Sequence, residues 1–394
     1  MNSTKSMFLL INESLFLEGQ ALSCNTSDWD WPSIYKELCV QSIEALPYKF
    51  LKEDVVSDEK LCTEWKKRCL AQFAHWGQIM YGQQKMLQLL EENHIDCVIL
   101  KGSAAALSYP QPMLRVMGDV DFLVRRADYE KTANLLEQNG FKLAHEKNSE
   151  SHHYAYIKDG ISYELHKRMA IVRESDKELN ALFDNGITNR EIKQVGSFSF
   201  PVLPSDLNGL VLLFHINQHL RSGLGLRQII DWMMYIDKNG IDRLLPLLKK
   251  TEMEKFAFTV TAMCQKYLGL KTIIPMKDDY PCDELMEFIL SKGNFGRKSG
   301  EKGKIASVFL DMSNPIRVFK RLQAGGQARW KAAKKYKVLR PFAWIFQITF
   351  IIRELNRNKI TLNQFGEQRE EGLEQRKLIE KLGLQVERMI DSEE

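Results

Sequence analysis

The sequence predicts an α+β fold, in which a small mixed β-sheet core lies between N-terminal helices and a mainly helical C-terminal domain. Apolar residues recur at helical spacing before residue 93. Short β-rich runs follow, and helical spacing returns after Pro204. Because 394 residues exceed what one hydrophobic core comfortably holds, we expect three domains, at 1–93, 94–203 and 204–394.

The elements follow from local patterns. A helix is expected to begin at Asp28 or Asp30, since Pro32 suits a first helical turn, and a long helix covers 62–93. The later expected elements are strands at 97–101, 118–126 and 196–203, a helix at 128–139, a hairpin at 153–167 turning at Asp159-Gly160, and helices at 224–238, 240–250 and 253–269. A Gly/Lys-rich loop at 292–304 is the clearest internal break.

The composition describes an ordinary globular chain. Its 55 basic and 51 acidic residues leave a net charge of only +4, which does not by itself indicate a nucleic-acid-binding protein. Seven scattered cysteines without a Cys-x-x-Cys pair favour a reducing compartment and argue against a cysteine zinc site. The most apolar segment, 341–352, falls short of the ~20 residues that span a bilayer. We therefore expect a cytoplasmic protein.

Two acidic residues alternate on the strand "GDVDFLV". Asp119 and Asp121 are expected to share one face, with Cα atoms ~7 Å apart, while Val120 and Phe122 point to the core. Neighbouring carboxylates repel each other, and Mg²⁺ relieves that repulsion because it prefers oxygen ligands. Glu164, on the second strand of the expected hairpin, has the parity to join them as a third metal ligand.

A glycine-serine pair precedes this strand. Gly102 permits a tight turn and close approach to a ligand, and a helix starting near Ser103 would present free N–H groups to a triphosphate, with the Ser103 hydroxyl on a phosphate oxygen. Arg115 and Lys101 are the candidates for charge stabilisation on the triphosphate. Strand, Gly-Ser, helix and Asp-x-Asp strand, in this order, indicate a site of nucleotidyl transfer.

These motifs carry a resemblance to a known family. Gly102-Ser103 followed by Asp119-Val-Asp121 resembles the signature of the polymerase-β-like nucleotidyltransferase superfamily. The stretch "VILKGSAAALSYPQPMLRVMGDVDFLV" looks like the bacterial family of uncharacterised nucleotidyltransferases, as do Glu164-Leu-His166 and "LRQIID", which ends at Asp231. The resemblance is close over about 95–170 and fainter over 200–235. Fifteen residues separate Ser103 from Asp119, slightly more than is usual in the superfamily.

The resemblance implies a Mg²⁺-dependent enzyme that moves a nucleoside monophosphate from an NTP to a hydroxyl or similar group and releases pyrophosphate. Asp119 and Asp121 would hold two metal ions, ~3.5–4 Å apart, and Glu164 would hold the catalytic one and help to deprotonate the acceptor hydroxyl. His166 and Asp231 are candidates for contact with the acceptor or for support of the ligands. The large helical share suggests a small-molecule or peptide acceptor.

Several residues have competing interpretations. His215 and His219 have the spacing of a metal pair on one helix, but their Leu/Phe-rich surroundings favour hydrogen bonding in the core. His152-His153 is interpreted as a loop end. For Asp231 we favour a surface ion pair with Arg227, one turn earlier, over a role at the acceptor.

The segment 317–340 combines many lysines and arginines with Phe319, Trp330 and Tyr336. This composition suits nucleic acid or an anionic membrane surface, although a solvated helix face balanced by the acidic stretch at 366–375 is favoured. If the segment does bind such a partner, the protein could be a catalytically inactive module that recognises an anionic partner through 317–340, and this is the main rival function. A second rival is an AMP-transferring toxin or antibiotic-inactivating enzyme, which differs only in its acceptor.

Overall fold

The structure is a computed structural model that describes residues 3–17, 21–52, 55–144, 152–169, 171–173, 175–275, 277–298, 315–357 and 362–385. The chain forms two compact units: unit 1 is Met1–Lys298 with Lys381–Glu394, and unit 2 is Ser299–Glu380. The division falls inside the predicted loop at 292–304. The domain boundaries expected at 93 and 203 lie within unit 1 and stay a prediction.

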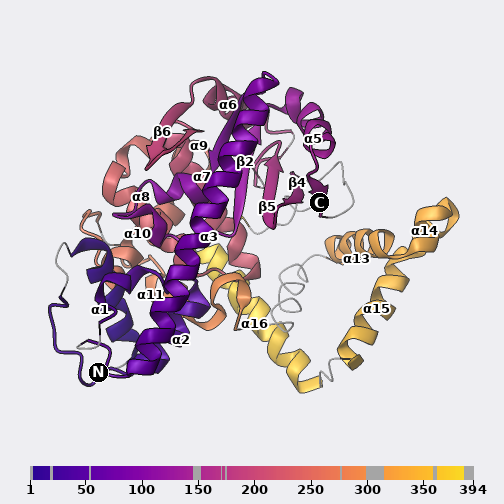
Figure 1. The fold of residues 1–394 in the computed structure, drawn as a ribbon. Helices are drawn as coiled ribbons and strands as arrows, with labels where there is room; N and C mark the ends of the chain where they lie inside the picture. Colours follow the sequence, from indigo (N-terminus) through magenta and orange to yellow (C-terminus); the bar gives the residue numbers. More distant parts are fainter. Residues whose placement is uncertain are drawn as a thin grey trace. The chain divides into compact units, whose positions relative to one another are not determined.

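Unit 1 contains a mixed sheet whose order in the described part of the chain is β3-β4-β5-β2-β1-β7-β6 (Figure 1). Its strands are β1 (Cys97–Leu100), β2 (Asp119–Val124), β3 (Lys142–Leu143), β4 (His153–Lys158), β5 (Ile161–His166), β6 (Glu191–Val195) and β7 (Phe198–Val202). β2 runs parallel to β5, and β1 runs parallel to β7, whereas the remaining neighbours are antiparallel.

Helices of unit 1 precede, interrupt and follow the sheet. They are α1 (Ser3–Phe16), α2 (Trp31–Gln41), α3 (Glu59–Glu92), α4 (Gly102–Ala106), α5 (Tyr129–Gln138), α6 (Lys177–Thr188), α7 (Ser205–Ser222), α8 (Leu226–Asn239), α9 (Leu245–Lys250), α10 (Glu254–Leu268) and α11 (Cys282–Lys292). Short 3₁₀ turns are η1 (Leu46–Phe50), η2 (Pro112–Leu114), η3 (Arg126–Asp128), η4 (Asp242–Leu244) and η5 (Asn294–Gly296). Asp30 caps α2, as the sequence predicts. The α+β prediction is confirmed.

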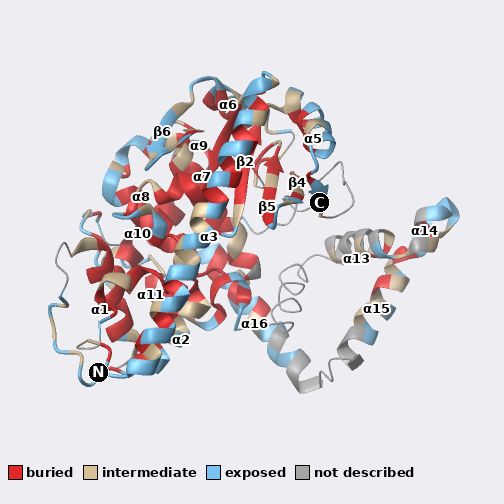
Figure 2. Cartoon of the chain, viewed as in Figure 1, coloured by how far each residue is buried: buried red, intermediate tan, exposed pale blue. Residues whose placement is uncertain are grey.

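One face of the sheet forms the core of unit 1. Val120, Phe122 and Val124 of β2 pack with Leu165 of β5 and with apolar residues of α3 and α5, and all are almost fully buried. Figure 2 shows β2 and the inward side of α3 in the colour of buried residues. Because strand side chains alternate, the acidic residues of β2 are left on the opposite face.

Helix α7 lines a small recess together with Lys101 and His166, and it packs on α8 at close range. A Cβ added at Gly209 would lie 2.4 Å from the ring of Tyr235, which is buried and hydrogen-bonded to the backbone of Ser205. Among the residues that the structure describes, no atom lies within 4 Å of the corresponding position at Gly77 in α3. Glycine at 209 is therefore a packing requirement, whereas glycine at 77 only weakens its helix.

We expect Gly209→Ala to lower the free energy of unfolding by about 1–3 kcal/mol, because a rigid ring must move. Gly77→Ala is the matched control, and its better helix propensity should raise stability by about 0.5–1 kcal/mol. Denaturant unfolding of both variants measures the two effects. Equal effects of the same sign would refute the packing argument.

Unit 2 is helical. It contains α13 (Pro315–Arg329), α14 (Lys331–Lys335), η6 (Lys337–Phe342), α15 (Ala343–Arg357) and most of α16 (Leu362–Lys381). Trp330 stacks on Phe346 with ring centroids 5.4 Å apart, and Phe319 contacts Trp344. Among the helices that the structure describes, none has the length and apolarity needed to cross a membrane.

Candidate active site

The three predicted carboxylates share one face of the sheet. In the parallel β2–β5 pair, Asp121 lies directly opposite Glu164, and Asp119 lies opposite Ser162. On the other side of β2, Asp121 is paired with Leu100, the last residue of β1. The register therefore collects the acidic residues where β1 ends.

Asp121 is held between Lys101 and His166. Lys101 Nζ donates to Asp121 Oδ1 at 2.8 Å, and His166 Nε2 lies 2.9 Å from the same oxygen. Burial alone would raise the pKa of Asp121, but the charge of Lys101 and the hydrogen bond from His166 outweigh it and hold the pKa well below its usual range. Asp121 is therefore a fixed carboxylate anion.

Asp119 has the opposite electrostatic environment. Burial, followed by repulsion from Asp121 and Glu164, raises its pKa to about 6. Negative charge at this position is thus incompletely compensated by the protein's own cations. A bound cation would remove the deficit.

The turn after β1 aims Lys101 at the carboxylates. Lys101 has φ 43° and ψ −131°, a backbone region that side-chain-bearing residues rarely adopt, and Gly102 follows with φ 21°. Such strain costs of the order of 1–3 kcal/mol and is typical of functional positions. The predicted glycine turn is present at the end of β1.

Ser103 lies at the start of α4, as expected, but its hydroxyl is already engaged. Its side chain is buried, and its Oγ donates to Gln83 Oε1 of α3 at 2.7 Å. Contact between this hydroxyl and a phosphate would require the hydrogen bond to Gln83 to break. The phosphate role of Ser103 stays a prediction.

Arg115 and Asp231 form a buried ion pair, which corrects the interpretation of Asp231. Arg115 Nη2 and Nε donate to the two carboxylate oxygens of Asp231 at 2.8 and 3.2 Å, and the Tyr109 hydroxyl donates to Oδ1 at 2.8 Å. The expected surface pair between Asp231 and Arg227 is wrong, because Asp231 faces inward from α8 and is 1% exposed.

Arg227 is a further cation near the acidic face. From the sequence it was expected only to pair with Asp231. Its Nε is buried and has no hydrogen-bond partner among the described residues, and its guanidinium lies 5.2 Å from the ring centre of Phe295. Burial and the neighbouring charge of Arg115 lower its pKa to about 10, and its charge in turn favours ionised Asp119. The sequence signal that could have indicated a role for Arg227 is its place in "LRQIID", one of the segments that resemble the family.

The histidines also differ from expectation. His153 opens β4 and is paired with His166 of β5, and His152 is buried beside both rings, so the interpretation as a loop end is wrong. The pair His215 and His219 is hydrogen-bonded on α7 as expected, with Nε2 atoms 2.9 Å apart, and His215 is buried while His219 is partly buried. Burial holds the pKa of His219 at about 3.

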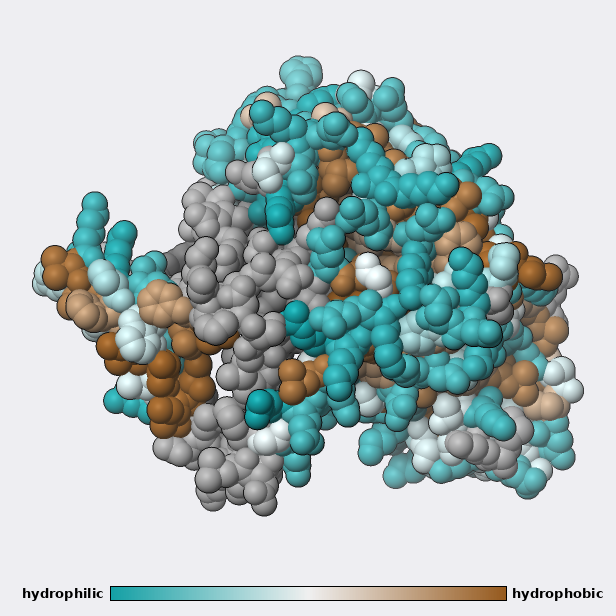
Figure 3. All heavy atoms as spheres, turned by 180° about the vertical axis from the view of Figure 1, so that it is seen from behind, coloured by the Kyte–Doolittle hydropathy of each residue, from teal (hydrophilic) through white to brown (hydrophobic). Residues whose placement is uncertain are grey.

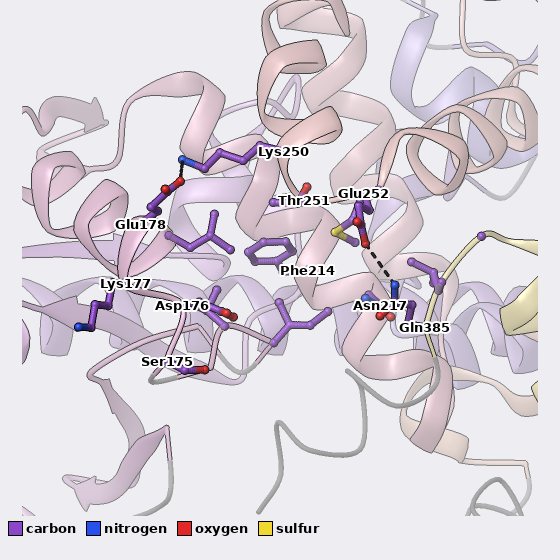
Figure 4. Close-up of a pocket in the computed structure, with 16 residues that line it drawn as sticks. Ser175, Asp176, Lys177, Glu178, Phe214, Asn217, Lys250, Thr251, Glu252 and Gln385 are labelled. Atoms are coloured by element: carbon purple, nitrogen blue, oxygen red, sulfur yellow. Dashed lines mark hydrogen bonds and ion pairs between the residues drawn. The ribbon is translucent and has the colours of Figure 1, made fainter. Parts of the chain in front are cut away.

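A cavity of about 440 Å³ lies beside the site (Figure 4). Phe214 of α7 lies at its centre, Asn217 lines it one turn later, and the Lys250–Glu178 ion pair crosses its rim. The buried Oδ1 of Asn217 has no hydrogen-bond partner in the part of the chain that the structure describes. Phe214 also lines a small recess that contains Lys101 and His166, so the cavity adjoins the carboxylate face.

The raised pKa of Asp119 predicts a pH effect on metal-free protein. Its folded value of about 6 lies above the ordinary 3.8, so the folded state binds the proton more tightly, and this stabilisation is fully present below pH 4 and is lost as pH rises through 6. In the Asp119→Asn variant the carboxyl group is replaced by an amide, which does not ionise. We therefore expect its melting temperature to rise relative to that of wild type between pH 4 and pH 7. A difference that is constant with pH would contradict the assignment.

A mixed sheet with an Asp-x-Asp strand, a neighbouring acidic strand and a glycine turn beside them is the arrangement that the sequence predicts for a nucleotidyltransferase. The chain belongs to the family described as uncharacterised nucleotidyltransferase, whose model matches residues 27–269.

A solved structure, an antigenic nucleotidyltransferase-like protein from Paracoccidioides brasiliensis, is similar to this chain at 14% identity and a TM-score of 0.31, covering 50% of this chain and 95% of that one. No curated protein matches the chain.

Proposed function

We propose that the protein catalyses Mg²⁺-dependent transfer of a nucleoside monophosphate from an NTP to a hydroxyl or similar group of a small acceptor, with release of pyrophosphate, in the manner of polymerase-β-like enzymes. The observation that carries the proposal is the convergence of Asp119, Asp121 and Glu164 on one sheet face beside the strained turn at Lys101. The seven free thiols support the cytoplasm as the proposed location.

The donor set fits magnesium. The carboxylates of Asp119, Asp121 and Glu164 supply hard oxygen ligands, and the raised pKa of Asp119 marks negative charge that the protein leaves uncompensated. In the proposed assignment both aspartates hold the ions and Glu164 holds the catalytic one. Bound Mg²⁺ would stabilise the charge on the attacking and leaving oxygens.

The chain's own residues have distinct roles in this proposal. A bond forms between the acceptor oxygen and the α-phosphorus, while the bond between the α-phosphorus and the oxygen that leaves with pyrophosphate breaks. Glu164 receives the proton of the acceptor hydroxyl. Lys101 and Arg227 contact the triphosphate, since the guanidinium of Arg115 is already committed to Asp231. Arg115 and Asp231 instead fix the loop before β2.

The cavity of Figure 4 is the proposed acceptor site. Its volume suits a small molecule, and Phe214 offers an apolar surface, while the carbonyl of Asn217, which no described residue contacts by a hydrogen bond, offers an acceptor. The shared Phe214 joins it to the recess at Lys101 and His166. His166 lies between the acceptor site and Asp121.

Labelled nucleotides test the reaction class. The protein is incubated with Mg²⁺, a fractionated cell extract and NTPs that carry label in the α or the γ phosphate. Nucleotidyl transfer places the α label on an acceptor and releases the γ label as pyrophosphate. Transfer of the γ label to an acceptor would show a kinase and overturn the proposal.

Unit 2 supports a second candidate function, the binding of an anionic partner through 317–340. Hydrophobic and hydrophilic residues lie side by side on this unit in Figure 3. Phe319, Tyr336 and Val338 are exposed, and the exposed bases Lys335 and Lys337 flank Tyr336 in the sequence. A phosphate-rich partner would lose affinity steeply as salt increases. Binding that is insensitive to salt would exclude this candidate.

A further inference from the structure

Three imidazoles meet on the sheet next to the carboxylates. His152, His153 and His166 each offer a ring nitrogen, and these atoms lie within 4.8 Å of one another. We propose that the three histidines bind a transition-metal ion of the Zn²⁺ class, at a site separate from the oxygen ligands of the proposed magnesium site. Figure 1 places their strands, β4 and β5, side by side.

The backbone holds the histidines in place. His153 and His166 are Cα partners in the antiparallel β4–β5 pair, and their rings stack with centroids 5.2 Å apart. His153 Nδ1 lies 2.9 Å from His152 Nε2. Two nitrogens bound at ~2.0–2.1 Å to a tetrahedral zinc ion lie ~3.3 Å apart, so a small adjustment opens this pair to a metal.

His166 supplies the independent observation. Its side chain is 4% exposed, and its Nδ1 is a buried polar atom without a hydrogen-bond partner in the described part of the chain. Its Nε2 faces Asp121 at 2.9 Å. A histidine that binds metal through one nitrogen and donates the other N–H to a carboxylate is the usual arrangement at metal sites. A metal at Nδ1 would satisfy the orphan atom.

The ligand chemistry of the cluster suits a transition metal. A neutral imidazole offers a nitrogen lone pair, and three such rings meet here. Nitrogen ligands favour zinc and related ions over Mg²⁺.

The surrounding charges act in both directions. Asp121 and Glu164 favour a cation at His153, while Lys101 opposes it there and both Lys101 and Arg168 oppose it at His152. Lys101 is itself paired with Asp121. The cluster thus resembles a nitrogen site beside an anionic oxygen site, and His166 lies between the two, with its Nε2 facing Asp121.

Zinc titration of the full chain tests the proposal without nucleotide. Chelator-treated protein is titrated with Zn²⁺ by calorimetry in excess Mg²⁺, and wild type is expected to bind one ion per chain with a rise in melting temperature. His152→Gln with His153→Gln should weaken binding by more than about 100-fold, because two ligands are lost. If the double variant does not fold, the single variant His153→Gln tests the same loss of zinc affinity, because His153 is only partly buried.

Two control variants distinguish the site from its neighbours. His219→Gln disrupts the other close histidine pair, and Asp119→Asn removes a carboxylate, so both should bind zinc as wild type does. Absence of zinc binding in wild type, undiminished binding by the histidine variants, or loss of binding in His219→Gln would each overturn the proposal. None of these results depends on whether the protein transfers nucleotides.

Discussion

Asp119→Asn is expected to lower nucleotidyl transfer by about three orders of magnitude while the protein remains folded. Asp119 is partly exposed, and burial and the charge of Asp121 both disfavour its ionised form, so an uncharged side chain of the same shape should not weaken the fold. Asparagine keeps the shape and removes the negative charge that a cation needs. Release of pyrophosphate and the melting temperature are measured on the same samples.

Asp237→Asn provides the matched control. Asp237 is an exposed aspartate on α8, so its amide variant should transfer nucleotide at the wild-type rate. Equal activity of Asp119→Asn and Asp237→Asn would remove Asp119 from the active site. An Asp119→Asn protein that is both inactive and unfolded would contradict the assignment of Asp119 to function rather than to stability.

The largest effect on stability is expected at Asp231. Asp231→Asn leaves Arg115 buried without its anion, which typically costs about 3–5 kcal/mol, and we expect the melting temperature to fall by about 10 °C. Tyr109 loses a charged acceptor in the same change. Thermal unfolding measures the shift.

Two further variants separate burial from charge. Glu284→Gln breaks an exposed ion pair with Lys381 and should change stability by less than about 1 kcal/mol. Replacing the buried pair by Arg115→Met with Asp231→Leu should recover much of the lost stability, because no charge is left unpaired. A loss at Glu284→Gln as large as that at Asp231→Asn would refute the argument from burial.

The sequence predicted the parts of the site that depend on local periodicity. Alternation placed Asp119 and Asp121 on one strand face, and the Asp159-Gly160 turn fixed the hairpin that brings Glu164 opposite Asp121. The missed strands have weak patterns: β3 has only two residues, and β6 is an exposed, charged edge. Period-2 burial is the signal on which strand prediction depends, and neither strand shows it.

Partners that are distant in the chain were not predictable from spacing. Arg115 and Asp231 are separated by 116 positions, and Ser103 reaches Gln83 through the packing of α3 on the sheet. His152 has no alternating pattern of its own and becomes part of a cluster only because β4 pairs with β5. Tertiary pairing, rather than local preference, decided these contacts.

Binding of Mg·NTP tests the central claim most directly. Each of the four NTPs is titrated by calorimetry into wild type and into Asp119→Ala with Asp121→Ala, with the fold of the variant checked by its melting curve. We predict that wild type binds at least one NTP only when Mg²⁺ is present, and that the folded variant binds none. Equal binding by both proteins, or no binding by wild type, would contradict a nucleotidyl-transfer site at these aspartates.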